Sequence, residues 1–209
     1  MLMQLDPTTL DRRVLYRWLI GCVVPRPIAW ITTLSENAVV NLAPFSFFNG
    51  VTSSPLVVSV AIAHRDPVKD TLRNLRATRE AVVHLATPAL LADVHQSGGD
   101  YASSVSEVAE LGLATIPSIV VRPPRLAECP VAFECRLLQE VPVGSPATAL
   151  CLLEVVHLHI SDAILGPDGF PDSRRWSTPA RLGGRSYLDG NGWTVVDQPL
   201  QVVPDDKRN

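Results

Sequence analysis

Short apolar runs separated by turn residues dominate this chain and predict a mainly β structure with a few short helices. Twelve glycines and eighteen prolines punctuate the runs, which favours strands over long helices. The predicted strands are Ile28–Leu34, Val39–Leu42, Leu56–Ile62, Ala81–Ala86, Ile119–Val121, Val131–Glu140 and Ala149–Ser161. Strands this short and this numerous indicate an antiparallel barrel that is closed or partly closed.

Three helices are predicted between the strands, each from a capping signal at its start. In the first helix, Val68, Leu72 and Leu75 fall on one face at helical spacing. The predicted starts are Asp66 with Pro67, Thr87 with Pro88, and Ser104 with Glu107; the second helix ends at about Gln96 and the third near Gly112. These short helices interrupt the series of strands.

The size and composition of the chain indicate one globular domain. It has 209 residues, of which 46% are hydrophobic and 19% charged, a balance that supports a buried core. No internal repeat or linker divides it, so we expect a single domain over residues 1–209, with 162–209 as a C-terminal extension. The formal net charge of −3 argues against a basic face for nucleic acid.

The chain carries no sequence signal for a membrane or for secretion. No stretch approaches the run of about 20 apolar residues that spans a bilayer, and the first residues, MLMQLDPTTLDRR, do not resemble a secretory signal. The four cysteines form no CxxC pair and fit no zinc spacing. We therefore expect reduced thiols in a cytoplasmic protein that binds neither a membrane nor nucleic acid.

A polar cluster at the first predicted helix is a candidate anion site. The unpaired N–H groups and the dipole of a helix start favour a negative ligand. Arg65 precedes the start, and Lys69 and Thr71 lie in the first turns, where they can hold a phosphate by charge and by a hydroxyl hydrogen bond. The alternative is an ordinary surface helix, which Asp66 and Asp70 support because they partly cancel the local charge.

The segment 43–49 is rich in aromatic residues, and we expect an irregular loop there. Phe45, Phe47 and Phe48 surround Ser46. A flat heteroaromatic ligand needs apolar walls and a few fixed donors and acceptors at its edge, and this segment supplies both. The alternative is that the phenylalanines fill the core of the barrel.

Four motifs, in order across most of the chain, resemble those of the flavin reductase-like, FMN-binding split-barrel proteins. They are PRPIAW at 25–30, NLAPFSFFN at 41–49, KDT with a following asparagine at 69–74, and RLGGRSY at 181–187. The resemblance extends from about Leu15 to Tyr187. It implies an FMN-binding split barrel, which is a Greek-key antiparallel β-barrel, and an oxidoreductase that works as a homodimer.

The resemblance also implies roles for individual residues. Hydride would pass from NADH or NADPH to flavin N5, so the chain has mainly to orient the rings, and no catalytic acid or base is assigned. The implied FMN-binding residues are Arg26, Phe45, Ser46, Phe47, Asn49, Arg65, Lys69 and Thr71, with Arg26 directed into the phosphate pocket. Arg185 and Tyr187 are implied to approach the flavin from the partner subunit and to control substrate access.

The favoured activity is therefore an NAD(P)H-dependent flavin reductase that serves a small-molecule electron acceptor or a monooxygenase component. Two alternatives stay open: a non-catalytic protein that stores or senses flavin, and an oxidase similar to pyridoxamine-phosphate oxidase. No GxGxxG motif is present, so the nicotinamide would bind transiently over the flavin. His157 and His159 share one side of a predicted strand, but no third ligand is evident and no metal is expected.

Overall fold

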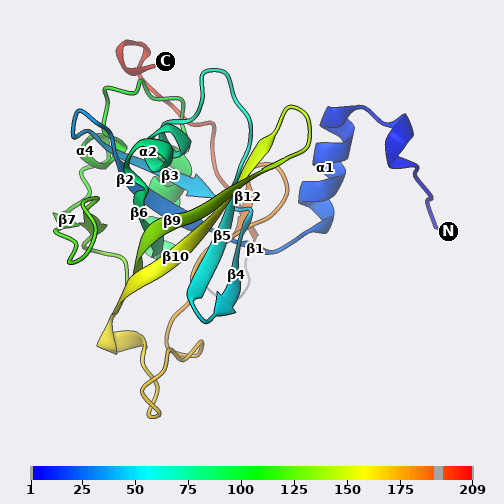
Figure 1. Ribbon diagram of the computed structural model, residues 1–209. Coiled ribbons are helices and arrows are strands. Elements are labelled where there is room, and N and C mark those ends of the chain that lie inside the picture. The colour runs from blue at the N-terminus through cyan, green and yellow to red at the C-terminus, as the bar shows by residue number, and fades with distance from the viewer. Residues whose placement is uncertain (1, 191–194, 209) are drawn as a thin grey trace.

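The fold is organised around a single curled antiparallel sheet (Figure 1). The computed structural model describes residues 2–190 and 195–208. The seven strands follow the order β3-β2-β6-β9-β10-β5-β4. Their bounds are β2 Ala29–Leu34, β3 Val40–Phe45, β4 Phe48–Ser53, β5 Leu56–Ile62, β6 Glu80–Leu85, β9 Val131–Val143 and β10 Thr148–Ile160. The expected mainly β, antiparallel split barrel is confirmed.

Smaller elements surround this sheet. The α-helices are α1 Arg12–Cys22, α2 Asp70–Thr78, α3 Leu91–Gln96 and α4 Glu107–Glu110; the short 3-10 helices are Pro7–Thr9, Pro88–Leu90, Asp162–Ile164 and Asp205–Lys207. Two short strands, β7 Thr115–Ile116 and β8 Arg125–Leu126, pair with each other, and a further small sheet joins β1 Arg26–Pro27, β11 Ala180–Arg181, β12 Ser186–Leu188 and β13 Val195–Asp197. Helix α1, strand β4 of the main sheet and the strands of the two small sheets were not predicted.

A two-residue link closes one end of the sheet. Strands β3 and β4 lie at opposite edges of the sheet order, yet only Ser46 and Phe47 separate them in sequence. The sheet therefore has to curl until its two edges meet at this point. The amide of Ala61 donates to the Phe47 carbonyl at 2.8 Å and fixes the link to β5. The expectation of an irregular loop over 43–49 is wrong, because this segment is mostly strand.

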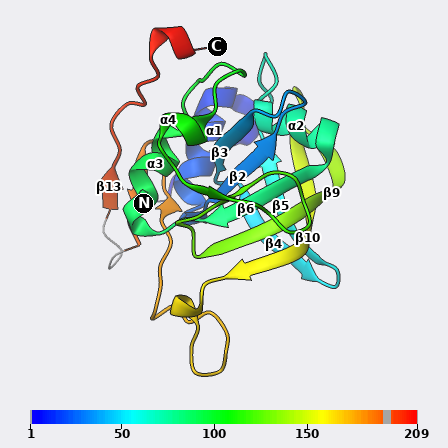
Figure 2. The same ribbon diagram turned by 90° about the vertical axis from the view of Figure 1, so that its left-hand side faces the viewer.

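The two faces of the curled sheet bury two separate apolar cores. Alternate residues of β2 divide between them, since neighbouring side chains of a strand point to opposite faces. Ala29 and Ile31 belong to the core inside the barrel, whereas Trp30 belongs to the outer core together with residues of α3 and α4. Figure 2 shows these two helices beside β2 and β3. Trp30 is fully buried, and its indole N–H donates to Ser97 Oγ at 2.8 Å. Tyr187, from the C-terminal part of the chain, belongs to this outer core.

Two of the predicted helix starts are wrong. Helix α2 begins at Asp70, with Lys69 at its N-cap, and not at Pro67. The carboxyl group of Glu107 accepts the backbone amide of Leu42 at 2.8 Å, so a contact between distant segments replaces the predicted local capping box with Ser104. The helix predicted from Thr87 is confirmed as a 3-10 turn followed by α3.

The predicted strand at 119–121 is wrong because its backbone amides bind a buried carboxylate. Glu134, on β9, is fully buried. It accepts the amides of Ile119, Val120 and Val121 at 2.7, 2.6 and 3.0 Å, and His159 Nε2 lies 2.6 Å from it. Burial alone would raise the pKa of Glu134, but these hydrogen bonds outweigh it and lower the pKa to about 2.

Replacing Glu134 with glutamine removes the charge that these donors share. We expect Glu134→Gln to lower the free energy of unfolding at neutral pH by about 1.5–3 kcal/mol, the usual value of hydrogen bonds to a buried charge. Urea unfolding followed by tryptophan fluorescence measures this loss. Glu36→Gln, at an exposed position, is the matched control and should be neutral.

The sign of the pH dependence follows from the lowered pKa. The stabilisation by Glu134 is complete above its unfolded pKa of 4.5 and is lost as the pH falls towards the folded value of about 2. The difference in stability between the wild-type protein and Glu134→Gln should therefore narrow as the pH is lowered from about 5 to about 3. A difference that stays constant over this range contradicts the assignment.

Candidate functional site

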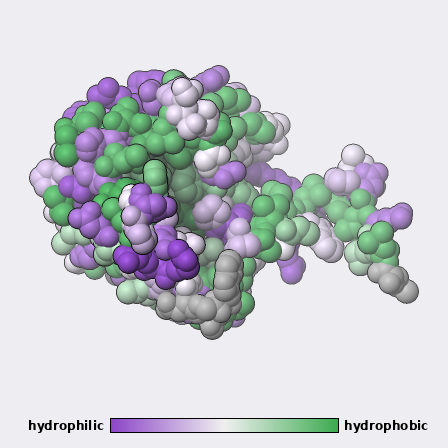
Figure 3. Space-filling model, turned by 90° about the horizontal axis from the view of Figure 1, so that it is seen from below, coloured by the Kyte–Doolittle hydropathy of each residue, from purple (hydrophilic) through white to green (hydrophobic). Residues whose placement is uncertain are grey.

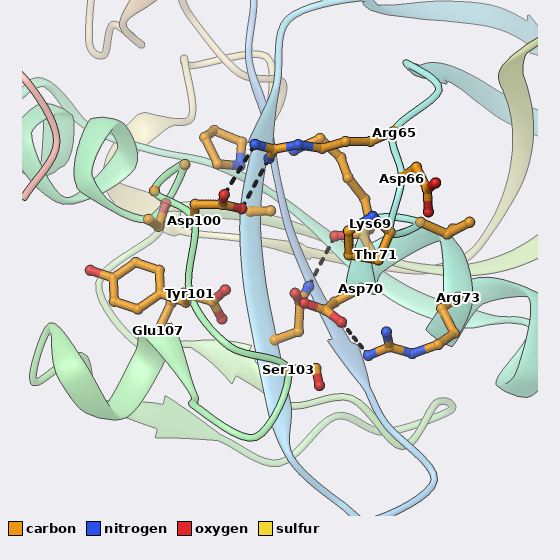
Figure 4. Close-up of a pocket in the computed structure, with 18 residues that line it drawn as sticks. Arg65, Asp66, Lys69, Asp70, Thr71, Arg73, Asp100, Tyr101, Ser103 and Glu107 are labelled. Atoms are coloured by element: carbon orange, nitrogen blue, oxygen red, sulfur yellow. Dashed lines mark hydrogen bonds and ion pairs between the residues drawn. The ribbon is translucent and has the colours of Figure 1, made fainter. Parts of the chain in front are cut away.

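A polar hollow of about 310 Å³ lies at the start of α2 (Figure 4). Its walls come from β3, from the segment 65–69 before α2, from the loop 97–101, and from α4. Of the residues that the sequence singled out, Arg65, Lys69 and Thr71 line it together. The structure thus brings the predicted anion cluster into one concave site.

Lys69 is the cation in this hollow that the protein itself leaves without an ion pair. Arg65 Nη1 lies 3.1 Å from Asp100 Oδ1, and Arg73 is paired with Asp70. Lys69 forms no ion pair with another residue of the described ranges, and its side chain is half-buried. Burial, reinforced by Arg65, lowers the pKa of Lys69. Its ammonium group is therefore available to an anionic ligand.

The first turn of α2 adds backbone donors to the site. The first helical hydrogen bonds run from the amides of Leu72 and Arg73 to the Lys69 carbonyl, each at 3.0 Å. The N–H groups of Asp70 and Thr71 precede these bonds, as they do at any helix start. Together with the helix dipole they favour a negative group next to Lys69.

A buried network of amides and hydroxyls positions Thr71. Asn41 Nδ2 donates to Thr71 Oγ1 at 3.0 Å and to Thr33 Oγ1 at 3.2 Å, and Asn74 Nδ2 donates to the same Thr33 oxygen at 3.1 Å. Because Thr71 Oγ1 accepts this bond, its own hydrogen remains available to donate. Of the three partners, Asn41 and Asn74 lie within motifs that the sequence had singled out, and Thr33 does not. Thr33 and Asn41 come from β2 and β3, far from α2 in sequence.

Glu107 also lines the hollow, although only a capping role was predicted for it. It is 5% exposed. Burial raises its pKa to about 7, against the lowering effect of the Leu42 amide. Glu107 therefore changes its charge close to neutral pH. No local sequence signal marks it, because its burial depends on the packing of α4 against β3.

Arg26 does not point into this hollow, contrary to expectation. Its guanidinium group donates to the carbonyls of Ile20, Val23 and Leu182 at 2.8, 2.5 and 2.8 Å. It thus joins the end of α1 to the C-terminal part of the chain. Its Nε lies 3.4 Å from Ser46 Oγ.

The residues expected around the flavin ring lie outside the hollow. Phe45 is 7% exposed and belongs to the core of the barrel, so the alternative interpretation holds for this side chain. Ser46 and Phe47 form the half-buried link between the sheet edges, and the Phe47 ring centroid lies 5.7 Å from the Arg26 guanidinium carbon. Asn49 is exposed on β4.

Tyr187 is an interior residue of its own chain, which corrects its expected place on a substrate path. It is 1% exposed, and its hydroxyl lies 2.9 Å from His95 Nδ1 and accepts a hydrogen bond from Arg181. Arg185, two residues earlier, is exposed.

Other candidate chemistry does not assemble into a site. The rings of His157 and His159 are 4.7 Å apart, and within the described ranges no group of three or more His, Cys, Asp or Glu residues is arranged to hold a metal ion. All four cysteines are free thiols. Within those same ranges, no helix has the length and apolar character needed to cross a membrane.

Comparisons with known proteins identify the family to which this split barrel belongs. The chain matches the flavin reductase like domain over residues 20–173, a stretch that contains the whole hollow. The protein therefore belongs to the flavin reductase-like family of split-barrel flavoproteins.

Individual relatives support this assignment. An uncharacterised protein of Halalkalibacterium halodurans is 37% identical over 203 residues, covering 94% of this chain and 97% of the relative. The crystal structure of nitrilotriacetate monooxygenase component B from Bacillus cereus is 26% identical, with a TM-score of 0.86 and coverage of 97% and 99% of the two chains. A Shewanella frigidimarina structure with a split-barrel domain, 18% identical with a TM-score of 0.78, covers 97% of this chain and 99% of its own and supports the fold alone.

Proposed function

We propose that this protein is an FMN-binding, NAD(P)H-dependent flavin reductase. The observation that carries the proposal is the unpaired Lys69 beside Thr71 and the first amides of α2, in a chain of the flavin reductase-like family. A bound flavin supplies the chemistry, because its N5 accepts hydride from a nicotinamide. The chain has to hold the cofactor, orient it and give the donor access.

The hollow favours FMN because FMN ends in a phosphate monoester. Lys69 would pair with the phosphate, Thr71 would donate its hydroxyl hydrogen, and the amides before the first helical bond would complete the site. Arg65 faces the same space and would exchange part of its pairing with Asp100 for the phosphate. These four kinds of donor suit a terminal phosphate at the mouth of the hollow.

The ring and ribityl contacts follow from the course of β3. Ala43 and Pro44 line the hollow, and the chain then continues to Ser46, Phe47 and Asn49. We assign these three residues, with the backbone around Phe45, to the flavin beyond its phosphate. Arg26 contacts Ser46 and the ring of Phe47, and so would hold them in position.

Electrons from the reduced flavin would pass to a small-molecule acceptor or to a monooxygenase component. The similarity to a protein named as component B of a monooxygenase supports the second route. The exposed Arg185 is our candidate for guiding an anionic donor or acceptor to the site. We place the reaction in the cytoplasm, where the four free thiols would stay reduced.

An anaerobic titration tests the activity. The protein is reconstituted with FMN, and NADH or NADPH is added in steps without oxygen while the flavin absorbance is recorded. Loss of the oxidised flavin band at one equivalent of either donor is the expected result. A flavin that stays oxidised with both donors favours a storage protein or an oxidase, and chromatography of the released chromophore distinguishes FMN from FAD.

Lys69→Ala should weaken FMN binding about tenfold to a hundredfold, because a charge-assisted contact to phosphate contributes about 1.5–3 kcal/mol. Fluorescence titration measures the dissociation constant. Riboflavin lacks the phosphate, so its affinity should stay unchanged in the same variant. Lys207→Ala is the matched control, since Lys207 pairs with Glu110 outside the hollow. Equal weakening of FMN and riboflavin contradicts the phosphate assignment.

We also propose a homodimer whose contact includes α1. This helix has no buried residue and projects from the barrel with apolar side chains exposed (Figures 1 and 3). Tyr16 and Leu19 are 54% and 50% exposed, and an isolated helix of eleven residues is marginal in water. A second copy of the chain is the proposed occupant, because one symmetric contact covers both exposed helices.

Leu19→Glu should shift the protein from dimer to monomer in light scattering, because it places a charge on the apolar face of α1. Arg12→Glu adds a glutamate to the first turn of the same helix and should leave the dimer intact. A wild-type protein that scatters as a monomer with flavin bound contradicts the dimer.

A further inference from the structure

The carboxyl group of Glu107 is the feature of the hollow that a phosphate site does not explain. Glu107 begins α4, is nearly fully buried, and lines the hollow together with Lys69 and Asp70. One of its oxygens accepts the Leu42 amide. An ionised carboxylate here would repel a phosphate dianion at close range.

The other charges of the hollow balance, so the protonation of Glu107 decides whether the hollow is neutral or negatively charged. The charged and titratable groups that line the hollow with Glu107 come from α2, from the segment before α2 and from the loop before α4; they are the cations Arg65, Lys69 and Arg73, the acids Asp66, Asp70 and Asp100, and the phenol of Tyr101. Three positive and three negative charges sum to zero. The hollow is therefore neutral when Glu107 carries a proton and has one negative charge when it does not. On α4 itself, Glu110 is paired with Lys207 outside the hollow.

We propose that Glu107 is a proton-dependent ligand of the flavin phosphate: as a neutral acid it donates a hydrogen bond to a phosphate oxygen, and FMN binding transfers one proton from solvent to its carboxylate. This inference rests on the proposed FMN site. A protonated carboxyl group has an O–H donor, whereas a carboxylate only accepts. Phosphate stabilises the protonated form, and the protonated form in turn stabilises bound phosphate.

The expected pH dependence follows from this linkage. Burial first, and then the charge of Asp70, raise the pKa of free Glu107 to about 7, against the opposing effects of the Leu42 amide and Lys69. Binding a phosphate raises the pKa of Glu107 further, so Glu107 takes up a proton from solvent when FMN binds above pH 7. The dissociation constant for FMN should then rise about tenfold per pH unit between about pH 7.5 and 8.5. The phosphate of FMN has its own second pKa near 6, below this range.

The test compares the full-length wild-type protein with Glu107→Gln, which keeps a donor but cannot ionise. FMN affinity is measured by fluorescence titration from pH 7 to 8.5, above the pKa of the FMN phosphate, with riboflavin as the ligand that lacks phosphate. We expect a rising dissociation constant in the wild-type protein, a flat profile in Glu107→Gln, and a flat riboflavin profile in both. Glu110→Gln, on the same helix but outside the hollow, should behave as wild type.

Calorimetry supplies a second measurement that needs no variant. FMN is titrated at pH 8 in buffers of different ionisation enthalpy, and the slope gives the protons taken up. Uptake close to one proton per FMN supports the proposal, and uptake near zero overturns it. Uptake or a pH slope that persists in Glu107→Gln assigns the proton to Lys69 and also overturns it. If FMN does not bind at any pH, the proposed phosphate site itself is wrong. If FMN binds without proton uptake, only the proposed role of Glu107 is wrong.

Discussion

The short connection between β3 and β4 is the constraint on which the molecule depends. Two residues cannot span an open seven-stranded sheet, so the two edge strands must meet, and the sheet becomes a barrel with a split. The same closure sets the position of β3, which carries Asn41, Ala43 and Pro44 past the start of α2. The hollow therefore forms because the sheet curls and places β3 next to the start of α2, and not because of a single loop.

Buried charge is handled differently at two places in the fold. Glu134 is surrounded by donors and stays ionised, and it holds the segment 119–121 against the sheet. Glu107 accepts fewer hydrogen bonds, among them that of the Leu42 amide, and burial disfavours its ionised form. The pKa of Glu134 is therefore lowered and that of Glu107 is raised, because hydrogen bonds outweigh burial at Glu134 and burial outweighs hydrogen bonds at Glu107.

What the sequence could predict depended on distance along the chain. The long strands β9 and β10 show their alternation locally, and Arg65, Lys69 and Thr71 sit within seven residues of one another, so both were found. Helix α1 was missed; it buries no side chain, and its apolar residues Tyr16 and Leu19 are exposed and not packed in a core.

Contacts between distant segments account for the errors. Glu107 looked like a helix cap because its true partner, the Leu42 amide, is 65 residues away. Arg26 and Tyr187 were read as site residues from their motifs, whereas the structure uses them to join separated parts of the chain. Side chains whose partners lie far along the sequence cannot be assigned from local patterns.

The strand order also has a consequence for synthesis on the ribosome. Before β9 and β10 emerge, the strands of the seven-stranded sheet can form only two separate parts, β3-β2-β6 and the β4-β5 hairpin, which no hydrogen-bonded strand yet connects. The edge of β6 stays unpaired until β9, which ends at Val143, has been made, and the edge of β5 stays unpaired until β10, which ends at Ile160, has been made. Exposed edges of this kind invite pairing with other chains, so the interval before β10 docks is the period in which this protein is most open to aggregation and to capture by chaperones.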